Sequence, residues 1–149
     1  MYQRVGTYEG NTPLQEMADR LLQFDVAWAP SNYGTTVEHL ALIRDAYQDE
    51  FGPYIPGKWA YTMLVLIKPE GGAVPIHRDV PQKAGLLRHH VVLQNNEHCW
   101  SYHDGDWQQL DLGGVYTVDE TRDHASINWG KTERIHLVVD VEKEGVTAK

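Results

Sequence analysis

The spacing of apolar residues changes from a helical to a strand period after about residue 55. Residues 12–15 form a capping-box pattern with proline at the first helical position. Apolar residues then recur at helical spacing, at Leu14, Met17, Leu21 and Leu22. A second capping pattern at residues 35–38 predicts another helix, which ends at Gly52-Pro53. Residues 24–34, between the two helices, form a loop rich in aromatic and turn residues.

From residue 56 onward the chain has the pattern of short strands separated by turn signals. The predicted strands are residues 59–68, 86–94, 98–103, 106–110, 115–118, 125–129 and 134–142. Asp104-Gly105 lies between two of them and is a strong signal for a two-residue hairpin turn. Short strands at close spacing, with the helices placed first, favour a small sandwich or barrel buttressed by helices. We therefore expect one domain over residues 1–149, with a helical N-terminal buttress at 1–55 and a β core at 56–142.

Two of the predicted strands divide their residues into an apolar face and a mixed face. In the strand 134–142, Ile135, Leu137, Val139 and Val141 alternate with Arg134, His136, Val138 and Asp140. In the strand 86–94, Leu87, Val91 and Leu93 oppose Arg88, His90 and Val92, and His89 should point to the face opposite His90. A solvated outer face would explain one such strand. Because both strands open their mixed face with Arg-x-His, the pattern favours the lining of a polar pocket.

Composition limits the classes of protein and partner that fit the chain. Its 149 residues are 42% hydrophobic and 23% charged, which is typical of one globular domain. The 13 basic and 21 acidic residues give a net charge of −8 without a basic stripe, so we expect no nucleic-acid partner. The single Cys99 excludes an internal disulfide framework and fits a reducing compartment.

The first residues of the chain and its apolar runs bear on localisation. Residues 1–10 lack the apolar segment of a signal peptide, and the longest apolar run, residues 63–67, is far too short to cross a bilayer. We therefore expect a soluble, cytoplasmic protein that does not bind membranes. The sequence leaves its oligomeric state open.

His77, Asp79 and His124 are the candidate metal ligands. Iron(II) sites that leave room for oxygen chemistry use two imidazoles and one carboxylate on a single face of the metal. Side chains two residues apart on an extended strand point the same way, so His77 and Asp79 can reach one ion. His124 would arrive from a distant strand folded back alongside. A His-x-Asp triplet alone is more often incidental, and the residues that follow it favour the metal site.

The order of these residues resembles that of iron(II)- and 2-oxoglutarate-dependent dioxygenases, which have the double-stranded β-helix, or jelly-roll, fold. Within that superfamily the chain resembles the aspartyl/asparaginyl β-hydroxylase family. That family has a metal-binding histidine, an Arg-x-His strand, a distal His-x-x-x-Asn and an arginine ten residues after the distal histidine. Here these are His77, Arg88-His89-His90, His124 to Asn128, and Arg134. The likeness covers residues 59–142, and the first 55 residues contribute nothing to it.

The resemblance implies an enzyme that uses iron(II), molecular oxygen and 2-oxoglutarate. It would couple oxidative decarboxylation of 2-oxoglutarate, to succinate and carbon dioxide, to hydroxylation of a C–H bond. The catalytic metal ligands would be His77, Asp79 and His124. Arg134 would pair with the distal carboxylate of 2-oxoglutarate, because a guanidinium can form two charge-assisted hydrogen bonds with a carboxylate. Arg88 would be a second contact to either carboxylate, and His90 could donate a hydrogen bond in the same region.

Asp79 is a departure from the resembled family, whose best-known members have glycine at this position and only two protein ligands to iron. The restored triad keeps prolyl and other amino-acyl hydroxylation open beside the aspartyl/asparaginyl type. We expect the substrate to be an amino-acid side chain, free or in a peptide or protein, with the loop 24–34 closing over it.

Two alternatives from other functional classes stay open. One is a cupin-type metalloenzyme that does not use 2-oxoglutarate, and the other is a non-catalytic jelly-roll module that binds a ligand or serves as a phage structural part. The pair Arg88 and Arg134 favours the dioxygenase over both.

Other polar residues on the predicted strands and turns have weaker assignments. His136 fits a ligand-orienting role and a buried core histidine equally well. For Asn128 a structural role at a turn is favoured over substrate contact. His98 and His103 flank the predicted hairpin, where we expect them to be exposed to solvent.

Overall fold

The computed structural model describes residues 2–22, 33–35, 47–79 and 86–142. Its elements are β1 (Gln3–Thr7), α1 (Leu14–Leu22), β2 (Tyr33–Thr35), β3 (Trp59–Ile67), β4 (Gly72–His77), β5 (Leu86–Gln94), β6 (Cys99–His103), β7 (Asp106–Gln108), β8 (Gly114–Val118), β9 (His124–Asn128) and β10 (Arg134–Glu142). A further short helical segment covers residues 47–51. Among the described segments, no helix has the length and apolar character that crossing a membrane requires.

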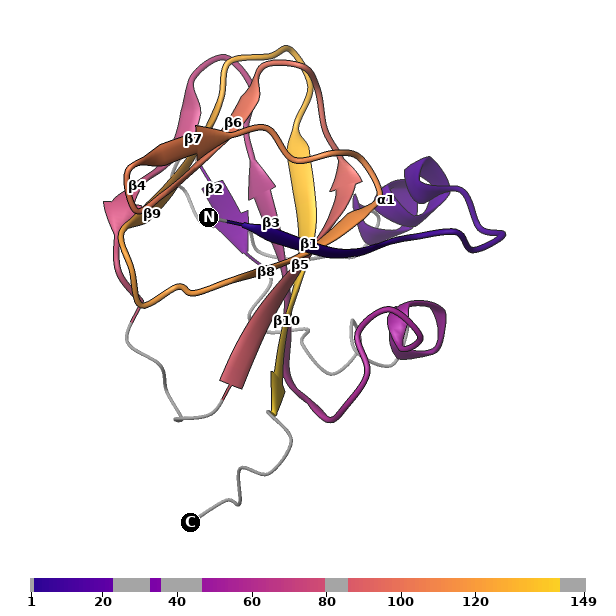
Figure 1. The fold of residues 1–149 in the computed structure, drawn as a ribbon. Coiled ribbons are helices and arrows are strands. Elements are labelled where there is room, and N and C mark those ends of the chain that lie inside the picture. The colour runs from indigo at the N-terminus through magenta and orange to yellow at the C-terminus, as the bar shows by residue number, and fades with distance from the viewer. Residues whose placement is uncertain (1, 23–32, 36–46, 80–85, 143–149) are drawn as a thin grey trace.

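The strands form two antiparallel sheets (Figure 1). One sheet has six strands in the order β1-β8-β5-β10-β3-β2, and the other has four in the order β4-β9-β6-β7. Side chains from both sheets line a common pocket. The predicted jelly-roll fold is therefore confirmed.

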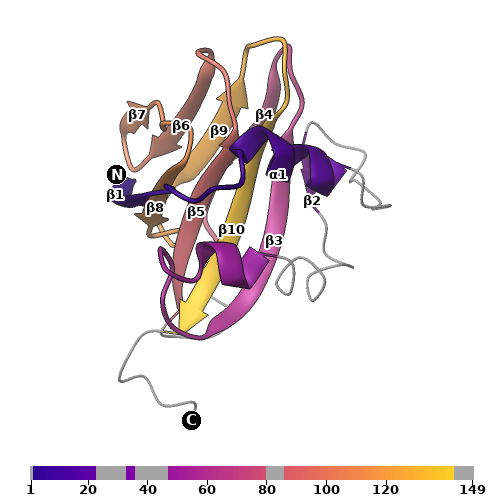
Figure 2. The same cartoon turned by 90° about the vertical axis from the view of Figure 1, so that its right-hand side faces the viewer.

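The hydrophobic core lies on the face of the six-stranded sheet that the helices cover. Leu64, Val91 and Leu137 on that face pack in one buried cluster with Met17 of α1 and Phe51 of the segment 47–51. Figure 2 shows α1 and this segment in front of the sheet. The period-two alternation places the polar residues of the same strands on the other face, where the pocket lies. The two predicted strand faces are confirmed.

Local sequence determines the strand boundaries where turn chemistry is strong. The strands 86–94 and 134–142 have the predicted bounds as β5 and β10. Asp104 and Gly105 both have positive φ, 49° and 103°, as the first and second residues of a tight β6–β7 hairpin turn. Glycine adopts this conformation without steric cost and aspartate tolerates it, which is why the pair is so strong a signal.

The segment 1–55 is not only the helical buttress that the sequence predicted. It adds β1 and β2 to opposite edges of the six-stranded sheet, where β1 pairs with β8 and β2 pairs with β3. The residues of β1 are mostly exposed, so this strand has no alternation of apolar and polar positions that a pattern search could find.

The helical predictions in this segment have three outcomes. Helix α1 is confirmed, although the side chains of Leu21 and Leu22 are outside the described part. The second helix has its predicted end, since residues 47–51 are helical and Gly52 begins a turn. Its beginning lies outside the described residues, as does most of the loop 24–34, whose last two residues belong to β2.

Candidate active site

Two of the candidate metal ligands face one another across a strand pair. His77, the last residue of β4, is the register partner of His124, the first residue of β9, and their ring centroids are 4.1 Å apart. The β4–β9 register shifts between Val74 and His77, and β4 ends at His77. Asp79 therefore lies beyond the strand, where its backbone N–H donates a 2.9 Å hydrogen bond to the carbonyl of Glu120. The expectation that His77 and Asp79 share one extended strand was wrong, although their side chains do converge.

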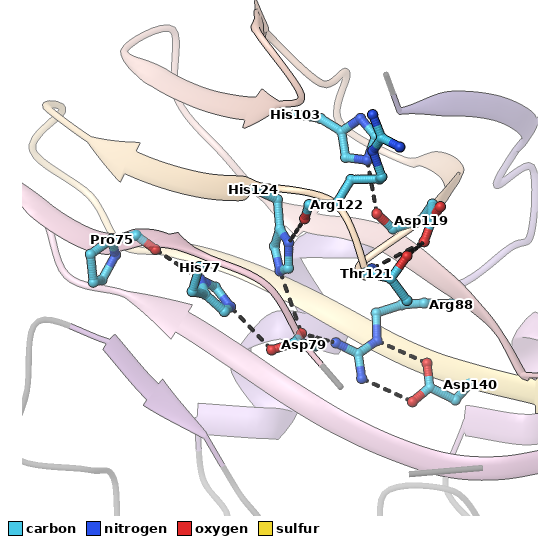
Figure 3. Close-up of polar contacts among 10 residues, drawn as sticks. All are labelled: Pro75, His77, Asp79, Arg88, His103, Asp119, Thr121, Arg122, His124 and Asp140. Atoms are coloured by element: carbon cyan, nitrogen blue, oxygen red, sulfur yellow. Dashed lines mark hydrogen bonds and ion pairs between the residues drawn. The ribbon is translucent and has the colours of Figure 1, made fainter. Parts of the chain in front are cut away.

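The side chains of His77, Asp79 and His124 form a compact group of potential metal ligands (Figure 3). One ligand atom from each lies within 4.8 Å of the others. The Nε2 atom of His77 is 3.3 Å from Oδ1 of Asp79, and Nε2 of His124 is 3.4 Å from Oδ2. This is the donor set of a facial triad.

Backbone carbonyls orient both imidazole rings. The Nδ1 atom of His77 lies 2.8 Å from the carbonyl oxygen of Pro75, and Nδ1 of His124 lies 2.8 Å from that of Arg122. A carbonyl oxygen only accepts hydrogen bonds, so each Nδ1 carries a hydrogen. In the neutral ring the lone pair is then on Nε2, the atom directed at Asp79, as metal ligation requires.

The electrostatics of the group also suit a metal. The hydrogen bond with His124 lowers the pKa of Asp79, against burial, which raises it, and Arg88 adds to the lowering. Asp79 is therefore a carboxylate at neutral pH. Burial opposes a charge on His124, but its hydrogen bonds with Asp79 and the Arg122 carbonyl prevail and raise its pKa. A metal cation can take the place of the proton that these two side chains share.

Arg88 joins Asp79 to Asp140 in a partly buried ion-pair network (Figure 3). Arg88 and Asp140 are register partners on β5 and β10. The guanidinium donates from Nε and Nη2 to the two oxygens of Asp140, at 2.8 and 3.0 Å, and from Nη1 to Oδ2 of Asp79 at 2.9 Å. Where the sequence suggested a cosubstrate contact, the structure gives Arg88 protein partners.

Arg134 is a buried cation that has no acidic partner among the described residues. It is 4% exposed, and its Nη1 donates to the hydroxyl of Ser126 at 3.2 Å. Its Nε has no hydrogen-bond acceptor in the described part of the chain. Burial lowers the pKa of Arg134 to about 10, so the side chain is still charged at neutral pH. Such a cation needs an anion to offset its desolvation.

The candidate ligands and both arginines line one pocket between the sheets, with a volume of about 240 Å³. His90 also lines it, and its Nδ1 lies 3.1 Å from Nδ1 of His136, which is buried and does not line the pocket. Burial and the nearby Arg134 hold the pKa of both rings well below the ordinary value. Both rings are therefore neutral, and one Nδ1 donates to the other.

Two residues with weaker assignments are now explained. Asn128 is fully buried; it accepts from the backbone N–H of Gly130 at 3.0 Å and donates to the carbonyl of Ile67 at 3.1 Å, so the structural role is confirmed. His103 is buried rather than exposed, with Nε2 2.8 Å from the carbonyl of Asp119. His103 is covered by a segment that lies 16 residues away in the sequence, and no local pattern shows such a contact.

Tyr2 and Glu120 also line the pocket, and the sequence analysis missed both. Both are buried. Neither lies in an alternating strand pattern or in a motif, so no local signal could have identified them.

Comparisons with known proteins identify the family to which the chain belongs. The chain matches the family described as aspartyl/asparaginyl beta-hydroxylase over residues 30–144, which begins well before the segment 59–142 that carried the resemblance. It is 26% identical over 82 residues to an L-proline cis-4-hydroxylase of Rhizobium meliloti (strain 1021). This match covers 55% of the chain and 29% of the relative, so the chain spans less than a third of that relative's length.

Solved structures agree on the fold. AviO1 from Streptomyces viridochromogenes superimposes with a TM-score of 0.66 at 15% identity, over 99% of this chain and 91% of the other. The viral collagen prolyl hydroxylase vCPH from Paramecium bursaria Chlorella virus-1, solved as a complex with 2OG, has a TM-score of 0.63 at 12% identity, over 95% of each chain. On the family match, the chain belongs to the aspartyl/asparaginyl beta-hydroxylase family of hydroxylating enzymes.

Proposed function

We propose that this protein is an iron(II)- and 2-oxoglutarate-dependent dioxygenase that hydroxylates an amino-acid side chain. One observation carries the proposal: a convergent His77, Asp79 and His124 group shares a pocket with Arg134, a buried cation without an acidic partner in the described part of the chain. The first feature suits a divalent metal, and the second suits an organic anion that binds beside it.

The donor set fits iron(II). Two neutral imidazoles and a carboxylate would hold the ion through Nε2 of each histidine and an oxygen of Asp79. An iron(II) ion at this place would supply the oxygen activation that couples decarboxylation of 2-oxoglutarate to hydroxylation. The chain's own contribution is orientation. The carbonyls of Pro75 and Arg122 orient the two rings, and Arg88 holds one oxygen of Asp79, which favours contact with the ion through the other.

The buried guanidinium of Arg134 fits the cosubstrate. 2-Oxoglutarate has a 2-oxo acid group, which can bind a metal, and a second carboxylate at its far end. Pairing that carboxylate with Arg134 would offset the desolvation of both charges. The related fold of vCPH, solved with 2OG, supports this cosubstrate for the site. A metalloenzyme of the cupin type that does not use 2-oxoglutarate would leave Arg134 without this partner.

The substrate class follows from the relatives and from charge. The family name refers to aspartyl and asparaginyl hydroxylation, and the curated relative is a hydroxylase of L-proline. The net charge of −8 disfavours nucleic acid. We therefore propose an amino-acid side chain, free or in a peptide.

Anaerobic titration tests the proposal. We expect iron(II) and 2-oxoglutarate together to give the wild-type protein a weak visible absorption band, and oxygen then to yield succinate. His124→Ala should lose both signals, whereas His98→Ala, which removes an exposed histidine paired with Glu97, should keep both. Metal binding without any response to 2-oxoglutarate would instead support the cupin-type alternative.

Screening then tests the substrate class. Succinate release should rise with L-proline or with prolyl or aspartyl peptides, and mass spectrometry should find one added oxygen in the stimulating compound. Coupled hydroxylation of a nucleoside, with no response to any amino acid or peptide, would contradict the proposed substrate class.

A further inference from the structure

Glu120 lines the pocket and has no part in the proposed binding of the metal or of 2-oxoglutarate. It lies two residues after the end of β8 and is only 7% exposed. Its backbone carbonyl accepts a 2.9 Å hydrogen bond from the N–H of Asp79. Val118, the last residue of β8, also lines the pocket and is the register partner of Arg88. Glu120 therefore lies beside the candidate metal ligands, with a buried carboxyl group in the pocket.

The carboxyl group of Glu120 forms no ion pair within the described residues, and no other described residue donates a hydrogen bond to it. Arg88 is the cation on the neighbouring strand β5, but its Nε and Nη2 donate to Asp140 and its Nη1 donates to Asp79. A carboxylate that is removed from water is costly unless a cation or several donors offset its charge. A ligand that carries a positive charge would supply both.

Neither the metal nor 2-oxoglutarate is that ligand. The convergent group of metal ligands does not include Glu120. 2-Oxoglutarate is an anion, and its proposed anchor Arg134 is distant from this side of the pocket. Arg134 and Asp140, which anchors Arg88, lie near opposite ends of β10, roughly 20 Å apart along the strand.

The side of the pocket at Glu120 is also the side that a substrate can reach. The side chain of Asp79, whose N–H contacts Glu120, is 34% exposed, and that of His77 is 36% exposed. Arg134, in contrast, is 4% exposed. A molecule that enters from solvent would therefore meet Glu120 and the metal position together.

We propose that Glu120 binds the α-ammonium group of the substrate, so that the enzyme acts on a free amino or imino acid rather than on a residue inside a peptide. The inference rests on the proposed function and narrows its substrate class. An ammonium group offers a positive charge and N–H donors to the carboxylate. An acylated nitrogen, as in a peptide bond, is uncharged and leaves Glu120 without a counter-charge.

Calorimetric titration of the full chain, loaded with manganese(II) and 2-oxoglutarate, tests this assignment. The standard free amino acids, L-proline first, are compared with their N-acetyl derivatives, which keep the side chain and lose the ammonium group. The wild-type protein should bind at least one free acid about ten- to hundredfold more tightly than its N-acetyl derivative, because hydrogen bonds to charged groups are worth that much. Nα-acetyl-L-lysine, whose only ammonium group is on its side chain, should bind no better than the other acetylated acids.

Glu120→Gln keeps the shape of the side chain and removes its charge. It should lower the affinity for the preferred free acid about ten- to hundredfold and leave the affinity for the N-acetyl derivative unchanged. Glu97→Gln is the matched control. It makes the same change at a side chain that is 86% exposed and paired with His98, so the preference for the free acid should remain.

Three results would overturn the role of Glu120. They are wild-type protein that binds no free acid more tightly than its N-acetyl derivative, a full preference that persists in Glu120→Gln, and Glu120-dependent tight binding of Nα-acetyl-L-lysine. The first of these does not depend on the folding of any variant. Wild-type protein that binds manganese(II) but not 2-oxoglutarate refutes the proposed function instead, and titration of the same acids into the manganese(II)-loaded protein then still tests Glu120.

Discussion

Replacing Asp140 by asparagine tests whether the partly buried ion-pair network orients the proposed metal ligand Asp79. Asp140 accepts two hydrogen bonds from Arg88, which in turn donates to Asp79. The side chain of Arg88 is only 17% exposed and that of Asp140 only 7%, so solvent screens the Arg88–Asp140 ion pair weakly. Asparagine has the same shape but no charge, and only one of its two terminal atoms can accept from Arg88.

The expected loss of stability depends on which hydrogen bonds of Arg88 the Asp140→Asn variant retains. Removing one partner of a buried ion pair costs roughly 3–5 kcal/mol when the other charge is left alone. Here Arg88 keeps Asp79 at 2.9 Å and one acceptor on the new side chain. We therefore expect a loss of about 2 kcal/mol in the free energy of unfolding, and a Tm lower by roughly 4–8 °C. The variant loses one of the two hydrogen bonds that fix the Arg88 guanidinium at residue 140. Arg88 then orients Asp79 less well, so metal affinity should fall about ten- to hundredfold.

Thermal unfolding and manganese(II) titration measure the two effects. Asp123→Asn is the matched control, because it removes an exposed aspartate that also pairs with an arginine, Arg78, at 2.6 Å. We expect that variant to keep wild-type Tm and metal affinity, since exposed pairs contribute little. If Asp140→Asn loses stability but keeps wild-type metal affinity, the network is structural and does not orient Asp79. If neither quantity changes, the stabilising role is wrong as well.

Three further predictions concern the pocket and its support. Arg134→Ala should weaken 2-oxoglutarate binding by about 3–5 kcal/mol and leave manganese(II) binding unchanged in calorimetry; undiminished cosubstrate affinity would exclude Arg134 as the anchor. Manganese(II) at one hundred times its Kd should stabilise the wild type by about 2.7 kcal/mol in urea unfolding, and His77→Ala should abolish the gain; equal stabilisation of both would place the ion elsewhere. Asn128→Ala should destabilise the fold by about 2–3 kcal/mol without changing metal affinity, because it leaves buried backbone groups unsatisfied; a change in metal affinity would contradict its structural role.

The sequence predicted those parts of the fold and site that depend on local periodicity. β5 and β10 each divide their residues between an apolar face and a mixed face, so their bounds and their two faces could be predicted. The convergence of His77, Asp79 and His124 was expected from a motif and is seen in the structure, although Asp79 lies beyond the end of β4. A local rule could not anticipate the register shift within this strand or its end at His77.

What the sequence did not predict depends on contacts between distant residues. The partner of Arg88 is set by the β5–β10 register, which brings Asp140 opposite it across 52 positions of sequence. Tyr2 lines the pocket directly before β1, which pairs with the distant strand β8. A single sequence contains no register, so it showed neither the Asp140 partner of Arg88 nor the place of Tyr2 in the pocket.

The position of β4 has a consequence for local stability. β4 is an edge strand of the four-stranded sheet, it contains Pro75, which has no N–H to donate, and its Ile76 is 60% exposed. Short edge strands of this kind open first in native-state hydrogen exchange. A metal ion held by His77 and His124 would link β4 to β9, and its binding free energy would then oppose that opening. Metal loading should therefore slow amide exchange in β4 far more than in the central strand β10, so exchange rates along β4 report occupancy of the site.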